Sequence, residues 1–208
     1  MGKSFNQLIC NFLIKNQDVL YRGDTIEPTI EPFSIAELAQ DIVLKFQPQT
    51  EAMDVNLISR FPKKLPLVKG DIGMIERAIS NLIQNALKFS GKGSTVALEI
   101  ERRQDTIEVR VGDNGPGIPK NDLPHIFERF YRVDKSRNRA SGGSGLGLAI
   151  VKKIVEAHEQ QISVQSDTQS GTVFSFKLPI WKKKVVSTTK NTTQTQKVFL
   201  KQIPYAFE

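Results

Sequence analysis

The 208-residue sequence has little cysteine and no long apolar run, and both absences limit what the protein can be. Its single cysteine, Cys10, excludes an internal disulfide and favours a reducing, cytoplasmic location. No stretch approaches the roughly 18 consecutive apolar residues that indicate a membrane-spanning helix. Residues 1–17 contain a short apolar run but no small-residue cleavage site, so they predict a helix rather than a signal peptide.

Net positive charge is small outside the C-terminal tail. The net charge is +7, but residues 181–208 hold six lysines and one acid and so account for +5 of it. The first 180 residues are therefore only about +2, which argues against a nucleic-acid or membrane partner. The tail is rich in lysine and threonine, and we expect it to be poorly ordered.

Apolar spacing and turn residues divide the chain into four segments. Residues 1–22 predict an amphipathic helix, 23–32 a connector with prolines, 33–180 a folded domain, and 181–208 the tail. Within the domain the pattern predicts helices over 34–46, 71–89 and 145–158 and strands over 55–59, 65–70, 94–102, 105–112, 161–166 and 172–178. This order predicts an α/β (α+β) two-layer sandwich, with helices on one face of a mixed, largely antiparallel sheet and a long loop over 113–144.

The glycine-rich stretch SGGSGLGLAIVKK (141–153) runs directly into a predicted helix. It is not a Walker A loop, because Gly147 is followed by Leu148 rather than lysine. It is not a dinucleotide fingerprint either, because no strand precedes it and its third glycine is missing. A flexible linker is the alternative. The backbone N–H groups at a helix start nevertheless favour a bound anion such as phosphate.

The helix over 71–89 carries polar residues on one face. Asn81, Asn85 and Lys88 stand at positions i, i+4 and i+7, which places them on a common stripe. Asparagine is a poor helix-interior residue, and its carbonyl oxygen is a ligand type that suits Mg²⁺. Lys88 is a point charge suited to phosphate. The alternative is an ordinary solvated face.

Between these two stretches lie a turn and a loop with their own chemistry. In VGDNGPGIP (111–119) Asp113 could cap the turn or, inside a pocket, accept a hydrogen from an exocyclic amine. In LPHIFERFYRVDKSRNR (123–139) an apolar island interrupts a polar, arginine-rich loop, which is typical of a lid. We expect His125 to be a lid or surface residue. We expect His158 to end its helix, where it would interact favourably with the helix dipole.

Taken in order, NLIQNALKFS, DNGPGIP, IFERFYR and GGSGLGLAI resemble the N, G1, F and G2 boxes of the sensor histidine kinase ATP-binding domain. That domain shares a superfamily with DNA gyrase, 90-kilodalton heat-shock chaperones and MutL-type ATPases. The resemblance covers roughly residues 30–180. It implies ATP and Mg²⁺ as cofactors, a two-component phosphorelay, and as partners a response regulator and a histidine-bearing dimerisation hairpin.

The resemblance also implies roles for individual positions. Asn85 would be the Mg²⁺ ligand, with Asn81 near the metal and phosphates and Lys88 reaching the phosphates. Asp113 would read the adenine amine, and Phe89 would take the place of the usual tyrosine beside the base. The further nucleotide contacts that it implies are Gly115, Gly117, Ile118, Phe130, Tyr131, Arg132, Gly143, Ser144, Gly145, Leu146, Gly147 and Leu148. Among these, Arg132 would contact the terminal phosphate, and Asn81, Lys88 and Arg132 would form the catalytic set.

Two features depart from the family pattern. No H box is present, since the two histidines lie in the lid and after the last helix. The glycine pair that usually follows the second histidine is replaced by Glu159-Gln160-Gln161. We therefore expect a histidine kinase domain that binds ATP and phosphorylates a histidine supplied by another segment or chain, without labelling itself. The alternatives are a truncated, non-catalytic ATP-binding or interaction module and an anti-sigma-type serine kinase.

Overall fold

A five-stranded sheet and three helices dominate the fold. The computed structural model describes residues 27–62, 64–133, 144–168 and 170–182. The elements in chain order are β1 (Glu31–Phe33), α2 (Ile35–Met53), β2 (Asn56–Arg60), β3 (Val68–Gly70), α3 (Ile72–Phe89), β4 (Thr95–Arg103), β5 (Thr106–Asp113), α4 (Gly147–Ala157), β6 (Ile162–Asp167) and β7 (Gly171–Pro179). Residues 1–22, nearly all of the tail and Gly143 fall outside the described residues, so the expectations for them stay predictions.

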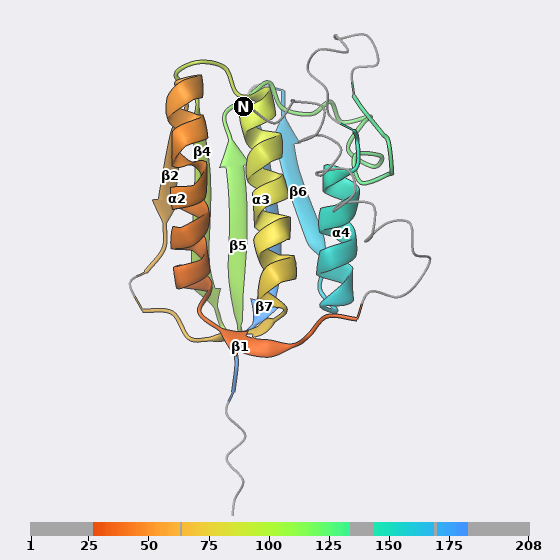
Figure 1. The fold of residues 1–208 in the computed structure, drawn as a ribbon. Coiled ribbons are helices and arrows are strands. Elements are labelled where there is room, and N and C mark those ends of the chain that lie inside the picture. Colours follow the sequence, from red (N-terminus) through yellow and green to blue (C-terminus); the bar gives the residue numbers. More distant parts are fainter. Residues whose placement is uncertain (1–26, 63, 134–143, 169, 183–208) are drawn as a thin grey trace, which may run out of the picture.

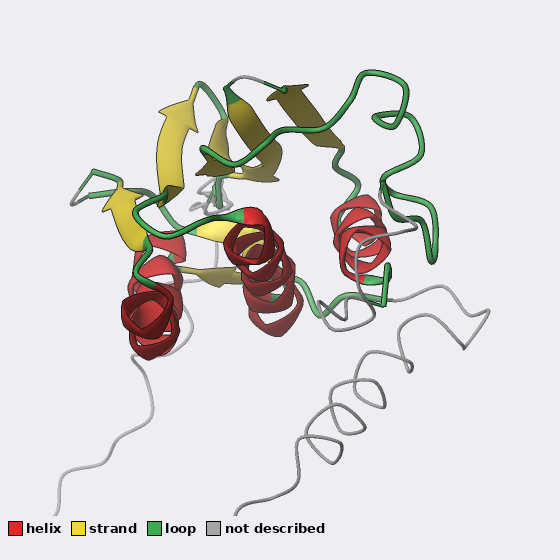
Figure 2. Cartoon of the chain, turned by 90° about the horizontal axis from the view of Figure 1, so that it is seen from above, coloured by secondary structure: helices red, strands yellow, loops and turns green. Residues whose placement is uncertain are grey.

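The helices form one layer and the sheet forms the other (Figures 1 and 2). The strand order is β2-β4-β5-β7-β6, with β2 parallel to β4 and the other pairs antiparallel. Helices α2, α3 and α4 cover a single face of this sheet. The predicted two-layer sandwich with a largely antiparallel sheet is confirmed. In the described part of the chain, no helix combines the length and apolar character needed to cross a bilayer.

The core lies between the two layers. Alternate residues of the central strands face the helices and are buried, as the period-two pattern of the sequence predicts. They are Val96, Leu98, Ile100, Ile107, Val109, Val111, Phe174, Phe176 and Leu178. They form one cluster with α3 residues such as Ile75, Ile79 and Leu82. Full burial of each large apolar side chain contributes about 1.5–3 kcal/mol, so this interface fixes where α3 lies on the sheet.

Two element predictions are wrong in extent. Helix α2 does not stop at residue 46 but continues to Met53, with Pro48 inside it. The buried face of the helix continues past Pro48 from Phe46 to Thr50, whose hydroxyl donates to the Gln47 carbonyl (2.9 Å). The strand predicted over 65–70 is only Val68–Gly70, and it pairs with β1 in a separate two-stranded sheet. Part of the predicted connector is therefore a strand.

His158 is the C-cap residue of α4, as the helix-terminal prediction requires. It is also buried, with 7% of its surface exposed, which the sequence did not predict. Its Nε2 accepts the backbone N–H of Asp71 (2.9 Å), and its Nδ1 lies 2.7 Å from the Ile154 carbonyl, which can only accept. The ring is thus neutral with its hydrogen on Nδ1. Because Asp71 caps α3, His158 joins the end of α4 to the start of α3.

Candidate functional site

The four sequence motifs meet at one end of the molecule. The C-terminal half of α3, the end of β5 and the start of α4 lie at the same end of the sandwich (Figure 1). A Cβ atom placed on Gly115 would lie 3.0 Å from the Phe89 carbonyl oxygen, so the turn after β5 touches the end of α3. The Phe130 N–H donates to the Gly145 carbonyl (3.0 Å), which joins the loop before α4 to the lid. Residues far apart in the sequence therefore surround one region.

Asn81 is the most buried member of the polar stripe on α3. Only 8% of its surface is exposed, and its side-chain nitrogen is buried without a hydrogen-bond partner among the described residues. Asn85 is half-buried and Lys88 is exposed, so the stripe runs from the interior to solvent. An unsatisfied buried amide nitrogen costs about 1–3 kcal/mol. This cost argues against the solvated-face alternative and favours a position that a ligand completes.

Two cations lie close together where α3 meets the lid. Although Lys88 is exposed overall, partial burial of its ammonium group lowers the pKa, and repulsion from the nearby Arg132 guanidinium lowers it further. The Lys88 Nζ also lies 5.2 Å from the centre of the exposed Phe89 ring. Two positive groups that repel each other at one place are suited to an anion that bears more than one negative charge.

Asp113 occupies the end of β5, on the face of the sheet that the helices cover. Its Oδ1 accepts the Gly115 N–H (2.9 Å), which forms a tight turn. Burial raises the pKa of the Asp113 carboxyl above its usual range, while hydrogen bonds from the backbone N–H groups of Gly115 and Thr172 partly offset that shift. The carboxylate is therefore fixed in place, with further lone pairs available to accept a hydrogen from a ligand.

The sequence prediction missed two hydroxyl residues beside Asp113. Thr172 on β7 is paired with Asp113 in register, and Ser166 on β6 is paired with Thr172. Thr172 is buried, and Ser166 accepts the Ile118 N–H (2.8 Å) from the turn that follows Asp113. A signal for both was present: each is polar at a position where the strand alternation calls for an apolar, inward-facing residue.

The lid is anchored at its apolar residues. Ile126 is buried, and the Phe127 ring meets Phe174 edge to face with 6.2 Å between ring centres. The Tyr131 hydroxyl donates to Asp122 (2.5 Å). These contacts confirm an apolar anchor for residues 123–133; residues 134–143 lie outside the described part of the chain.

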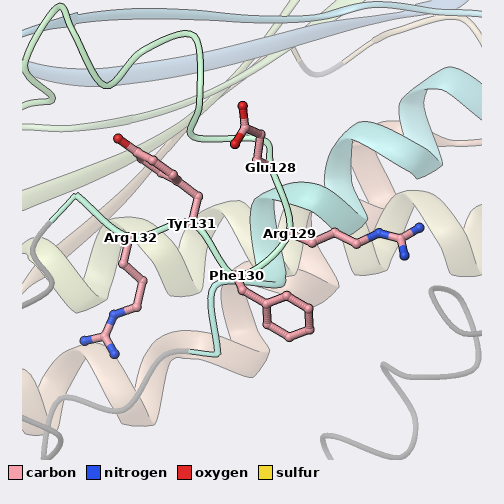
Figure 3. A pocket seen from close by; sticks show the side chains of 5 residues that line it. All are labelled: Glu128, Arg129, Phe130, Tyr131 and Arg132. Carbon is pink, nitrogen blue, oxygen red and sulfur yellow. The ribbon is translucent and has the colours of Figure 1, made fainter.

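Residues 128–132 of the lid line a hollow, and the described lid cations point in different directions. Glu128, Arg129, Phe130, Tyr131 and Arg132 line the hollow (Figure 3). Arg132 and Tyr131 extend to one side of the loop and Arg129 to the other. The Phe130 ring is 63% exposed. Asp113 and Asn81 do not line this hollow, which is formed by the lid residues alone.

The loop before α4 is tightly fitted to the lid. Gly145 has φ +69°, and a Cβ atom there would lie 2.8 Å from the Phe130 backbone, so only glycine fits. Leu146 is buried, Leu148 and Gly147 are half-buried, and Ser144 is exposed. No side chain caps the start of α4 at Leu146, which leaves the first-turn N–H groups of the helix without a side-chain acceptor. These groups can bind phosphate oxygens.

The residues present fit a Mg²⁺ ion that a nucleotide brings with it. Among the described residues, no cluster of three or more histidine, cysteine, aspartate or glutamate side chains could hold a metal alone. Mg²⁺ commonly keeps several waters and shares phosphate oxygens, so one amide oxygen such as that of Asn85 is a sufficient protein ligand. The orphaned nitrogen of Asn81, one turn before Asn85, marks the same region as incomplete without a ligand.

The sequence is similar to curated sensor kinases. It is 36% identical over 152 residues to the sensor-like histidine kinase SenX3 of Mycobacterium tuberculosis, covering 73% of this chain and 37% of SenX3. It is 39% identical over 140 residues to the sensor histidine kinase WalK of Bacillus subtilis, covering 66% of this chain and 23% of WalK. The chain thus spans well under half the length of these curated relatives.

The fold matches solved kinase structures. The catalytic domain of histidine kinase ThkA in a nucleotide-free form is 26% identical with a TM-score of 0.64, covering 73% of this chain and 97% of that one. ThkA has also been solved in complex with the response regulator protein TrrA; that structure is 24% identical, with a TM-score of 0.68, and the match covers 85% of this chain and 49% of that one. A family model described as histidine kinase-, DNA gyrase B-, and HSP90-like ATPase matches residues 70–182. Because this family model matches more than half of the chain, the chain belongs to the histidine kinase-, DNA gyrase B- and HSP90-like ATPase family.

Proposed function

We propose that the chain is the catalytic ATP-binding domain of a sensor histidine kinase, a phosphotransferase that passes the γ-phosphate of ATP to a histidine on another segment or chain. The observation that carries this proposal is the meeting of three features at one end of the sandwich. These are the fixed carboxylate of Asp113, the paired cations Lys88 and Arg132, and the uncapped start of α4. Asp113 suits the base of a nucleotide, and the two cations and the start of α4 suit its phosphates.

The residues divide the work between binding and charge neutralisation. Asp113 accepts the hydrogen of the adenine amine, and the first-turn N–H groups of α4 donate to the phosphates. Lys88 and Arg132 oppose the negative charge that develops as the γ-phosphoryl group leaves ADP. The incoming imidazole nitrogen forms the new P–N bond while the bond to the ADP oxygen breaks. A neutral imidazole is already a nucleophile, so the domain needs to supply position and charge rather than a strong base.

Asn81 and Asn85 are the residues that we propose for the metal. Asn85 would hold Mg²⁺ through its amide oxygen, and the bound ion would neutralise phosphate charge. Asn81 would donate its orphaned N–H₂ hydrogens to phosphate oxygens or metal-bound water. The single cysteine and the use of ATP support a cytoplasmic location, and the family resemblance supports a response regulator as partner.

We propose that the acceptor histidine comes from outside the described domain. His158 is buried and both of its ring nitrogens are engaged, and the His125 Nδ1 lies 2.7 Å from Glu128 Oε1. We expect the chain alone to bind ATP without stable self-phosphorylation. When a separate recombinant hairpin with an H box is added, we expect acid-labile, alkali-stable phosphate on its histidine.

The test uses radiolabelled ATP with Mg²⁺ and two hairpins, one intact and one with the acceptor histidine replaced by alanine. Label on the intact hairpin alone is the expected result. Stable label on His125 or His158 of the chain would contradict the proposed external acceptor, and transfer to serine would contradict the proposed reaction and favour the serine-kinase alternative.

A further inference from the structure

The turn that carries Asp113 lies directly on the hairpin between β6 and β7. A Cβ atom on Gly117 would come within 2.0 Å of the Asp167 carbonyl oxygen, and one on Gly171 within 2.0 Å of the Asp113 carbonyl oxygen. Backbone therefore meets backbone at two points with no room for a side chain between them. The position of the Asp113 turn depends on this hairpin.

Asp113, Thr172 and Ser166 form a row across three neighbouring strands. Asp113 pairs with Thr172, and Thr172 pairs with Ser166, so the three residues are in register. On each strand, the residue two positions away lies beneath the helices: Val111 and Phe174 are buried there, and Val164 is partly buried. All three side chains therefore face the helix-covered side of the sheet, at the end where the four motifs meet.

Ser166 uses its entire hydrogen-bonding capacity inside this row. Its Oγ lies 2.8 Å from the Ile118 nitrogen, 2.9 Å from the Gly171 carbonyl oxygen and 2.9 Å from the Thr172 Oγ1. The Ile118 N–H can only donate, and the Gly171 carbonyl can only accept. The single hydroxyl hydrogen of Ser166 therefore goes to Gly171, and the Thr172 hydroxyl must donate its own hydrogen to Ser166.

This assignment means that the Thr172 hydroxyl can only accept a hydrogen bond from a ligand. With its hydrogen committed to Ser166, the Thr172 oxygen presents lone pairs only, as the neighbouring Asp113 carboxylate does. Two acceptors side by side favour a base that carries an amino group and disfavour one that presents a carbonyl in its place. The same serine holds the Ile118 N–H and so fixes the far end of the Asp113 turn.

We infer that Ser166 is a positioning residue for base recognition: it fixes the Asp113 turn and turns the Thr172 hydroxyl so that the site selects an amine-bearing purine. The inference rests on the ATP-binding role proposed above. Ser166 acts through Asp113 and Thr172 and does not itself touch the nucleotide.

The test compares Ser166→Ala with the parent chain by equilibrium titration of two nucleotides in the presence of Mg²⁺. One nucleotide is ATP, and the other is the purine ribonucleoside triphosphate that lacks the 6-amino group. Ser163→Ala is the matched control, since Ser163 is exposed on the same strand and faces away from the helices. A thermal melt of each variant shows whether it is folded.

We expect Ser166→Ala to weaken ATP binding about tenfold, because it orphans the Ile118 N–H and releases the Thr172 hydrogen. Binding of the analogue without the amine should change less than about twofold, and Ser163→Ala should match the parent for both. An equal loss for both nucleotides would show a merely structural role and overturn the inference, as would an unchanged ATP affinity. If the parent itself does not bind ATP, the proposed function fails first and the inference falls with it.

Discussion

At the scale of single residues, the side-chain nitrogen of Asn81 lies buried on α3 without a protein partner among the described residues. Buried donors without an acceptor are rare in protein interiors, because such a donor has lost its hydrogen bonds to water and gained none in return. In the proposed site, the phosphates or metal-bound water would accept these hydrogens. In this proposal Asn81 would stabilise the nucleotide complex at the expense of the fold without nucleotide.

Replacing Asn81 with leucine separates these two effects. In Asn81→Leu the orphaned donor is gone and the volume is nearly kept, so we expect the free energy of unfolding without nucleotide to rise by about 1 kcal/mol. The stabilisation that saturating Mg²⁺ and ATP give to the parent should largely disappear. Chemical denaturation with and without the nucleotide measures both quantities.

The control for this substitution is Gln84→Leu on the exposed side of the same helix. It should leave the stabilisation by nucleotide as in the parent. A lower stability of Asn81→Leu in the absence of nucleotide would show that the buried amide has a structural partner, and would contradict its assignment to the nucleotide site.

Residue types and spacing were sufficient to predict Asn81, Asn85, Lys88 and Asp113 as candidates, and the structure brings their motifs together. Ser166 was not predicted, because its importance depends on register: it is paired with Thr172 on β7, which in turn is paired with Asp113. The burial of His158 at the end of α4 was not predicted for a similar reason. Its partner, the Asp71 N–H, is 87 positions away in the sequence.

At the scale of elements, the lid and the start of α4 are joined through the backbone. The Phe130 N–H donates to the Gly145 carbonyl, both residues have positive φ, and Gly145 has no room for a Cβ atom. Positive φ costs a non-glycine residue about 1 kcal/mol or more, so Phe130 is held there by its surroundings. The conformation of the lid is thus coupled to the loop that would wrap the phosphates.

The pair Gly145→Ala and Gly147→Ala tests this coupling. At Gly145 the added methyl group would lie 2.8 Å from the Phe130 backbone and in a left-handed conformation, so we expect a loss of about 1–3 kcal/mol in unfolding free energy. At Gly147 nothing lies within 4 Å of the new methyl group, so stability should stay the same or rise slightly.

Hydrogen exchange of the Phe130 amide reports the same contact locally. It should become faster in Gly145→Ala and stay near the parent rate in Gly147→Ala. Equal exchange rates and equal stabilities in the two variants would contradict the backbone connection between lid and loop.

The helices and strands were predicted correctly where the apolar period is long and unbroken. The prediction failed where a strand forms only by pairing with a distant segment. The helix that becomes α3 and the hairpin of β4 and β5 were predicted to within a residue or two. The strand β1 was missed because it has only three residues, and its partner β3 lies beyond α2 and β2 in the sequence. A pairing between distant short strands leaves no local pattern to detect.

At the scale of the whole molecule, different parts of the sandwich provide the stable core and the groups available to a ligand. One face of the sheet carries the helices and the buried core. The end of the sandwich where β5 and α3 finish and α4 begins carries the polar groups left for a ligand. Asp113 lies where these parts join: its carboxylate is held by the Gly115 and Thr172 N–H groups, from the turn and from β7.

The central claim is that this end of the sandwich binds Mg²⁺ and ATP through Asp113. Isothermal titration of the parent chain and of Asp113→Asn with ATP, with and without Mg²⁺, tests it most directly, with a thermal melt to show that the variant is folded. The amide of the variant would set an N–H₂ group against backbone N–H donors or against the adenine amine, so we predict Mg²⁺-dependent, saturable binding by the parent and a loss of about 1–3 kcal/mol in Asp113→Asn. Equal affinities for ATP in the two proteins, or no binding by the parent, would contradict the account.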